Sequence, residues 1–221
     1  MKILVVAPHC DDEVLGCGGT IAKYAASGND VYVLVVTKAV EPLFSKDLAE
    51  QVRNEGRAAD KLLGVKETIF FDFPAAMMED VPRYKINDAF TKIIQQIKPD
   101  IVFMPHRGDM QLDHKLTVDS LMVALRPKYD HIVKHIYAYE TLSETGWDIQ
   151  NHTNAFIPNV FIDISDYLNL KLEAMKLFES QLAEFPQARS IEAIRALAEY
   201  RGATMTMRAA EAFVAIREVL E

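Results

Sequence analysis

The sequence predicts an α/β fold: one domain, residues 1–221, built on a doubly wound, mostly parallel sheet flanked by helices. Three observations predict it. Continuous apolar runs over 3–7 and 31–36 are typical of strands that are buried on both faces of a parallel sheet. Segments of helical composition separate such runs, and several of them stop at a glycine or before a proline. This alternation indicates right-handed βαβ units, as in Rossmann-like sheets.

The other elements of the sheet follow the same alternation. Helices are predicted from composition over 19–26, 47–63, 84–98 and 113–125. The first three end at Gly28, at Gly64 and before Pro99, where glycine favours a left-handed cap and proline excludes a continued helix. Further strands are predicted from short apolar runs over 68–71, 101–104, 136–139 and 160–163.

The chain beyond the last predicted strand is expected to be a helical C-terminal segment. Phe185-Pro186 separates a helix over 166–182 from one over 191–200. The apolar residues of 209–220 recur at helical spacing, so a last helix is expected to pack against the sheet or a neighbouring subunit.

Bulk composition excludes several classes of function. Half of the residues are hydrophobic, and no low-complexity stretch divides the chain, so one core is expected. The net charge of -8, with scattered basic residues, argues against binding to nucleic acid. No apolar run approaches the length of a transmembrane segment or a signal-peptide core, which predicts a cytoplasmic protein. Cys10 and Cys17 are too few for a disulfide framework and are expected to be reduced.

A crowded group of ligand-type side chains follows the first predicted strand, at the sheet edge where ligands bind in such folds. His9 and Asp12 can converge on one divalent metal ion, while Asp11 faces a water molecule at the open coordination position. In the alternative interpretation, the two aspartates cap the following helix and His9 is a hydrogen-bonded core residue.

The turn after the fourth predicted strand, 105–114, offers a third metal ligand. His114 is our choice, and Asp113 beside it can orient a metal-binding imidazole through a hydrogen bond. His106 is the rival ligand or a residue that faces the substrate. For both histidines the alternative is a solvated loop residue.

Amide hydrolysis follows if His9, Asp12 and His114 hold zinc. The ion lowers the pKa of bound water and polarises the carbonyl, and Asp11 takes the proton as general base. Asp11 is then the simplest donor of a proton to the leaving amine.

Two other functions remain open at this stage. The glycines of 16–19 lie where a nucleotide-binding turn would, which allows a non-catalytic module that binds a nucleotide or sugar. However, the run lacks G-x-G-x-x-G, and Asp11 to Glu13 would repel a pyrophosphate, so we interpret these glycines as packing and turn residues. A metal-dependent phosphoester hydrolase is the second alternative.

The segment after the first predicted strand resembles the hallmark of the LmbE-like, or PIG-L, de-N-acetylases, which is A-H-P-D-D-E followed by a glycine-rich turn. The matching sequence is Pro8-His9-Cys10-Asp11-Asp12-Glu13, continued to Gly19. Similar pieces elsewhere are Arg53-x-Glu55 with Leu63-Gly64, and Arg201-Gly202 with Ala210-Glu211-Ala212-Phe213. The resemblance implies a zinc-dependent deacetylase of an N-acetylated, GlcNAc-like sugar or sugar conjugate, with Fe2+ as an alternative metal. It assigns zinc binding to His9, Asp12 and His114, and base catalysis to Asp11.

The chain departs from this family pattern at Cys10, which replaces a proline, and at Gln111. Gln111 stands where many members have the first histidine of H-x-D-H; it can donate a hydrogen bond to an oxyanion but cannot act as an acid. His106 is then a possible helper of Asp11 in protonation.

The resemblance and the residue types also suggest contacts with the substrate. Arg53 is a candidate for a substrate hydroxyl or phosphate, the loop residue Trp147 for a sugar face, and Arg201 for the same cleft. Each has a structural alternative, in packing or as a solvated helix end. Because related proteins often form oligomers and the C-terminal helices offer apolar faces, a homo-oligomer is expected.

Overall fold

The computed structural model describes residues 1–128 and 130–220. Within them, seven strands form one sheet in the order β3-β2-β1-β4-β5-β7-β6. The strands are β1 (Lys2–Ala7), β2 (Asp30–Lys38), β3 (Glu67–Pro74), β4 (Ile101–Pro105), β5 (His135–Tyr139), β6 (Val160–Asp163) and β7 (Ala210–Glu218). The helices are α1 (Asp12–Ala26), α2 (Lys46–Leu63), α3 (Arg83–Ile97), α4 (Leu112–Ala124), α5 (Leu168–Lys176) and α6 (Ile191–Ala203), with a short 3-10 helix, η1 (Met78–Asp80). The predicted α/β class is confirmed.

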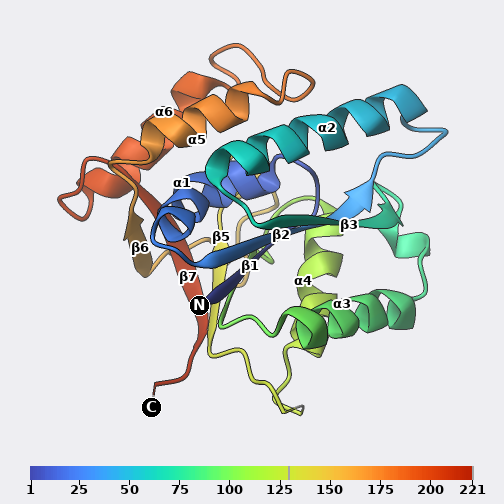
Figure 1. The fold of residues 1–221 in the computed structure, drawn as a ribbon. Coiled ribbons are helices and arrows are strands. Elements are labelled where there is room, and N and C mark those ends of the chain that lie inside the picture. The colour runs from blue at the N-terminus through green and yellow to red at the C-terminus, as the bar shows by residue number, and fades with distance from the viewer. Residues whose placement is uncertain (129, 221) are drawn as a thin grey trace.

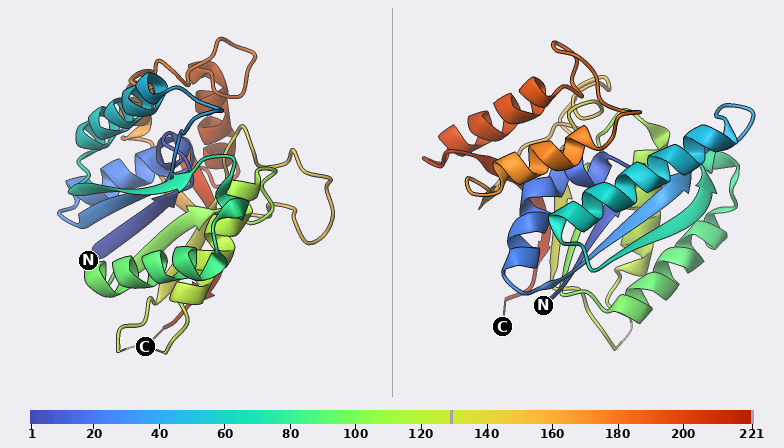
Figure 2. Two further views of the ribbon diagram at one scale, coloured as in Figure 1. Left: turned by 90° about the vertical axis from the view of Figure 1, so that its right-hand side faces the viewer. Right: turned by 45° about the horizontal axis from the view of Figure 1, so that its top comes forward.

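Helices cover both faces of the sheet (Figures 1 and 2). Helices α1, α2, α5 and α6 lie on one face, and α3 and α4 lie on the other. Residues of alternate direction along β1 divide accordingly: Ile3 and Val5 belong to the apolar core beneath α1, whereas Leu4 and Val6 belong to the core beneath α3. Burial on both faces explains why this strand reads as a continuous apolar run.

The direction of winding reverses between β1 and β4. Strand β1 pairs in parallel with β2 on one side and with β4 on the other, so the chain leaves β1 in one direction and returns to its opposite edge. Such a switch point leaves a crevice at the carboxyl ends of the two strands. The two polar turns singled out in the sequence, after β1 and after β4, therefore meet at one place.

Helix α1 begins at Asp12, seven residues before the predicted start, and includes the glycine-rich run. These glycines allow close packing: a Cβ on Gly19 would lie 2.7 Å from Ile164 Cδ1, and one on Gly16 would overlap the ring of Tyr139. The interpretation of the glycines as packing residues agrees with this arrangement. The early start also places Asp12 in the first turn of the helix.

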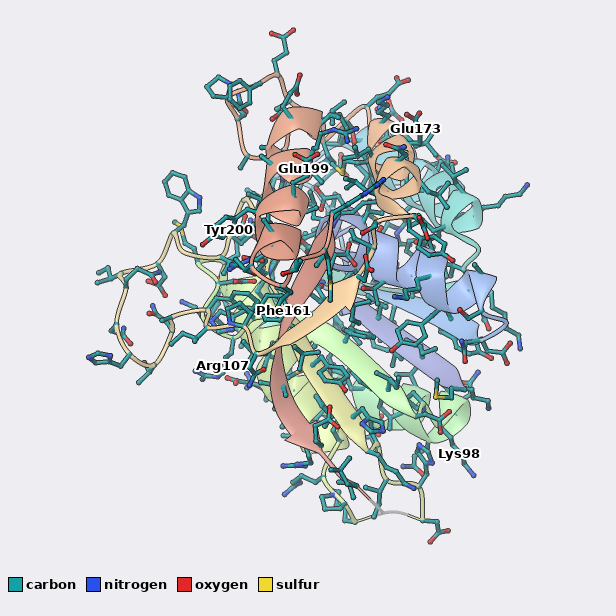
Figure 3. The ribbon with its side chains drawn as sticks, turned by 90° about the vertical axis from the view of Figure 1, so that its left-hand side faces the viewer. Lys98, Arg107, Phe161, Glu173, Glu199 and Tyr200 are labelled. Atoms are coloured by element: carbon teal, nitrogen blue, oxygen red, sulfur yellow. The ribbon has the colours of Figure 1, made fainter. Side chains whose placement is uncertain are left out.

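The predicted C-terminal helix over 209–220 is wrong. Residues Ala210–Glu218 form β7, which lies antiparallel between β5 and β6, the strand that carries Phe161 in Figure 3. Tertiary contacts override local helical spacing here. The carboxylate of Glu211 accepts hydrogen bonds from the backbone N–H groups of Gly19 (2.9 Å) and Thr20 (2.7 Å) and pairs with the buried Lys171 at 2.6 Å.

Helix α5 is shorter than the predicted helix over 166–182. It ends at Lys176, and Ser180 is held instead by α2: its N–H donates to Glu55 Oε1 at 3.2 Å and its hydroxyl donates to Glu55 Oε2. The segment that follows leads to Arg189 and then to Ser190, which caps α6 by accepting from Ala193 N–H at 3.2 Å. No helix within the described ranges is long and apolar enough to cross a membrane.

Candidate metal centre and active-site pocket

His9, Asp12 and His114 come together at the carboxyl ends of β1 and β4. One potential ligand atom from each lies within 4.8 Å of the other two. Asp12 Oδ2 is 3.3 Å from His9 Nδ1 and 3.2 Å from His114 Nε2, and it also accepts the backbone N–H of His9 at 2.9 Å. The fold thus joins the turn after β1 to the first turn of α4, as the sequence predicts.

Two further aspartates fix the orientation of the imidazoles. His9 Nε2 is hydrogen-bonded to Asp113 Oδ2 at 3.0 Å, and His114 Nδ1 is hydrogen-bonded to Asp109 Oδ2 at 2.9 Å. Asp113 therefore orients an imidazole as expected, although that imidazole is His9 and not its neighbour His114. Sequence reasoning missed Asp109, which is fully buried and also accepts from Thr145 Oγ1 at 2.6 Å. An acid five residues before His114 in the same turn was the available signal.

The donor set fits a divalent metal ion. If His9 donates Nε2–H to Asp113 and His114 donates Nδ1–H to Asp109, the lone pairs of His9 Nδ1 and His114 Nε2 are directed toward Asp12. His114 Nε2 and Asp12 Oδ1 are buried without a hydrogen-bond partner among the described residues. Two imidazoles and one carboxylate suit zinc, and they also form the ligand set of non-haem iron(II) sites.

The two histidines and Asp12 shift one another's pKa values. Burial opposes the cationic form of His9, but hydrogen bonds to Asp113 and Asp12 outweigh it and raise the pKa of His9 to about 9. Burial also opposes a charge on His114, whereas Asp12 and Asp109 raise its pKa to about 10. The pKa of Asp12 is correspondingly held well below its usual range by the two histidines. A metal ion must therefore compete with protons for these imidazoles.

Asp11 is separate from the three ligand-type residues but opens onto the same site. It precedes α1 in the left-handed region, at φ 113°, and its backbone N–H donates to Glu13 Oε2 at 3.1 Å. Its Oδ2 is buried without a hydrogen-bond partner among the residues that the structure describes, and Arg189 Nε lies 3.5 Å from it. Burial, and then repulsion by Asp12, raise the pKa of Asp11 to about 7. A carboxylate with that pKa is suited to accept and return a proton near neutral pH.

A cavity of about 240 Å³ adjoins these residues. His9 and Asp11 form part of its wall, together with Arg53 from α2, Gln111 from the start of α4, and Arg189. The guanidinium of Arg189 is steadied by Gln181 Oε1 at 3.1 Å and Ser143 Oγ at 3.3 Å. The structure therefore places the predicted residues Arg53 and Gln111 at one pocket with Asp11, and adds Arg189 to them.

Three other predicted residues lie outside the wall of this cavity. His106 Nε2 is hydrogen-bonded to the carbonyl of Asn154 at 3.0 Å, and its ring contacts Phe156 edge-on. Arg201 forms a two-pronged ion pair with Glu140, at 2.8 and 2.7 Å. Trp147 is 68% exposed. The roles suggested for these three residues stay predictions.

Comparison with known proteins identifies the family. Residues 4–125, more than half of the chain, match the family model described as PIG-L, GlcNAc-PI de-N-acetylase. The chain belongs to the PIG-L de-N-acetylase family. It is 27% identical over 206 residues to the diacetylchitobiose deacetylase of Thermococcus kodakarensis, covering 83% of this chain and 71% of that one.

Solved structures extend the similarity to nearly the whole chain. The N,N'-diacetylchitobiose deacetylase of Pyrococcus horikoshii superimposes with a TM-score of 0.76 at 26% identity, over 97% of this chain and 83% of that one. The 4-carboxy-2-hydroxymuconate hydratase GalB of Pseudomonas putida gives a TM-score of 0.81 at 20% identity, over 100% and 98% of the two chains. The second likeness shows the fold alone. An enzyme that acts on N-acetyl amides is thus indicated by the family.

Proposed function

We propose that this member of the PIG-L family is a zinc-dependent deacetylase that hydrolyses the N-acetyl amide of a GlcNAc-like sugar or sugar conjugate. The proposal rests on the different positions of the side chains in the turn after β1. His9 and Asp12 lie close to His114, while Asp11, one residue before Asp12, has a carboxylate oxygen without a hydrogen bond among the described residues. Fe2+ is the alternative ion, because the donor set suits both metals.

His9, Asp12 and His114 would hold the metal, and a bound zinc ion would supply Lewis acidity that activates water and polarises a carbonyl. Asp11 takes the proton from the attacking water. Asp12, Asp109 and Asp113 are each paired with a histidine of the site, whereas Asp11 is hydrogen-bonded to neither histidine among the described residues. Its pKa of about 7 leaves a large ionised fraction at neutral pH, and burial makes the protonated form accessible as well.

The leaving amine must then receive a proton. Asp11 holds the one removed from water and lies in the same pocket, so it can return that proton without a second acid. Gln111 lines the pocket and can donate an amide hydrogen bond to developing negative charge, but it has no proton to transfer. Arg53 and Arg189 are two of the cationic groups on the wall, and both can orient the substrate.

The relatives support sugars as substrates. Diacetylchitobiose deacetylase is the name of one relative, and another, 44% identical over 66 residues that make up 29% of this chain, acts by name on 1D-myo-inositol 2-acetamido-2-deoxy-alpha-D-glucopyranoside. Both names describe an acetamido group on a glucosamine unit. We therefore expect the acetamido group of such a unit to enter the pocket beside Asp11.

A cytoplasmic location and a homo-oligomeric assembly remain predictions from the sequence.

The experiment is a screen for acetate release by zinc-loaded protein. The substrates are N-acetylglucosamine, N,N'-diacetylchitobiose and N-acetylglucosamine 1-phosphate, each with and without prior metal removal by a chelator. We expect acetate release from at least one sugar, its loss after chelation, and its return with added zinc. Phosphate release without acetate release would identify a phosphoester hydrolase instead. Sugar-dependent thermal stabilisation that ignores the chelator, without turnover, would favour a binding module.

A further inference from the structure

A second cavity lies next to the catalytic pocket and shares part of its wall. Its volume is about 600 Å³, and it is lined by the segment after β2 and by one side of α2. Lys38, Ala39, Ala49 and Arg53 line both cavities. A substrate whose sugar occupies the smaller pocket can therefore extend over these residues into the larger one.

Lys38 is the unusual residue on this shared wall. It is half-buried at the last position of β2. Its ammonium group has no hydrogen-bond or ion-pair partner among the residues that the structure describes. An ammonium group without a partner, on a half-buried side chain, can form a charge-assisted hydrogen bond with an anion brought to it.

The other cations of the larger cavity are engaged by groups of this chain. Arg53 Nη2 pairs with Asp72 at 2.8 Å, and Lys46 pairs with Glu41 at 3.7 Å. Arg57 stacks over the ring of Phe70, 4.7 Å from its centroid, and bonds to Asn54 Oδ1. Because both of these groups are neutral, neither offsets the positive charge of Arg57.

The acidic residues of this wall do not cancel that charge. Glu41 is the partner of Lys46, and Glu50 is exposed on α2. Counting the residues that line the cavity, four are cationic and two are anionic, in a chain with a net charge of -8. This local excess of positive charge attracts anionic ligands to the cavity more than to the rest of the surface.

The backbone holds Lys38 in a fixed place relative to the catalytic residues. Thr37, the preceding residue, donates its N–H and its hydroxyl to the carbonyl of Pro8, at 3.0 and 2.8 Å. The carbonyl of Lys38 accepts the N–H of Ala75 at 2.9 Å. The end of β2 is thus fastened to the residue before His9, so an anion at Lys38 would sit at a constant offset from the metal-ligand cluster.

We infer that Lys38 is a specificity-determining residue that binds an anionic group of the substrate, a phosphate or a carboxylate attached to the N-acetyl sugar. The inference rests on the proposed function and names its substrate class. Arg57 adds long-range attraction from α2. Neutral N-acetyl sugars lack the group that the free ammonium would bind, so they should be poorer substrates.

The test compares three substrates of the zinc-loaded full chain by acetate release. They are the neutral methyl glycoside of N-acetylglucosamine, N-acetylglucosamine 1-phosphate, and N-acetylglucosaminyl malate, which carries carboxylates. We expect kcat/KM for one of the anionic substrates to exceed that of the neutral one at least about tenfold, as a charge-assisted hydrogen bond allows. Which anion is preferred distinguishes phosphate from carboxylate. Raising the salt concentration should narrow the difference.

Variants assign the preference to Lys38. Lys38→Gln should lower the ratio of anionic to neutral kcat/KM about tenfold or more. Lys61→Gln, an equal change of net charge at an exposed site in the last turn of α2, should leave that ratio unchanged. Equal use of neutral and anionic sugars, or a preference that Lys38→Gln does not alter, would overturn the inference while leaving the deacetylase function intact.

A binding measurement separates failure of the inference from failure of the proposed function. If no substrate releases acetate, the proposed function fails, and calorimetric titration with N-acetylglucosamine 1-phosphate and N-acetylglucosaminyl malate decides the role of Lys38. Tighter binding of one of them than of the methyl glycoside, lost in Lys38→Gln, would support the anion site. Absence of that difference for both would refute it.

Discussion

Asp113 Oδ2 accepts a hydrogen bond from His9 Nε2 at 3.0 Å. Asp113 therefore orients His9, although the histidine next to it in the sequence is His114. The same oxygen accepts the N–H of Ala76 at 2.7 Å, which fixes the carboxylate. Removal of such an outer carboxylate typically weakens metal binding 10- to 100-fold, because the ligand ring loses its orientation and basicity. We expect Asp113→Ala to weaken zinc binding by about that factor.

Competition with a fluorescent zinc chelator measures the effect. Asp119→Ala is the matched control, since Asp119 lies on the same helix and pairs with Arg107 away from the cluster. Equal zinc affinity of Asp113→Ala and the control would show that the hydrogen bond to His9 has no part in metal binding.

Arg189 is expected to matter for turnover more than for metal binding. Its Nε lies 3.5 Å from Asp11 Oδ2, and both residues line the same cavity. Under the proposed function, loss of this cation removes an electrostatic partner of the base and a group that would face the substrate. Arg189→Gln should lower kcat/KM for acetate release by about tenfold or more, with one zinc still bound per chain. Arg195→Gln, a change of equal charge at an exposed position of α6, should behave as wild type; similar activity of the two variants would exclude a role for Arg189.

Asp60 makes stability depend on pH. Burial raises the pKa of this α2 carboxyl to about 7, although Thr68 Oγ1 donates to it at 2.6 Å. Because the folded pKa lies above that of the unfolded chain, the folded state holds an extra proton between about pH 4 and 7. Stability from this group is therefore present at low pH and lost as the pH rises through 7. Asp60→Asn removes that loss.

Urea unfolding of the metal-free proteins at pH 5 and pH 8 tests this expectation. The gain in unfolding free energy from Asp60→Asn should be larger at pH 8 by about 1 kcal/mol or more, given roughly 1.4 kcal/mol for each unit of pKa. A gain that is the same at both pH values would show that Asp60 is ionised in the same way before and after folding.

Two helical glycines should respond to alanine in opposite directions. A Cβ on Gly19 would lie 2.7 Å from Ile164 Cδ1, so Gly19→Ala should destabilise the protein by about 1–3 kcal/mol through overpacking. On Gly56 of α2 the nearest atom would be Cys10 Sγ at 3.4 Å, an ordinary contact. Gly56→Ala should therefore stabilise by about 0.5–1 kcal/mol. In thermal unfolding, a higher Tm for Gly19→Ala would contradict the packing role of Gly19, and a lower Tm for Gly56→Ala would contradict the expected gain at Gly56.

The sequence could predict the strands of the parallel sheet and the meeting of its two polar turns, because buried parallel strands are continuously apolar and ligand sites follow their carboxyl ends. It could not predict β7, since the strand Ala210–Glu218 is selected by pairing with β5 and β6 and not by local pattern. Its buried Glu211 is satisfied by Lys171 and α1, which are distant in sequence.

For the same reason, the sequence could not predict which aspartates form hydrogen bonds to the two histidines of the site. Whether Asp113 or Asp109 serves His114 depends on how the turn after β4 folds back on itself, which no spacing rule specifies. That the ammonium of Lys38 has no partner among the described residues is likewise a property of its surroundings, because the acidic side chains nearby pair with Lys46 and Arg53 instead. Sequence pattern thus located the cluster, and tertiary structure determined how its members are oriented.

We propose that Asp11 acts as the base beside a metal held by His9, Asp12 and His114. Zinc content and acetate release, measured together for the wild type, Asp11→Asn and His114→Ala, test these roles. Asparagine tolerates the left-handed backbone that Asp11 adopts, so this variant should keep the local fold. We predict one zinc per chain in Asp11→Asn with turnover at least about 100-fold lower, and loss of zinc and turnover in His114→Ala. Wild-type turnover in Asp11→Asn would refute Asp11 as the base, and full zinc content in His114→Ala would refute His114 as a metal ligand.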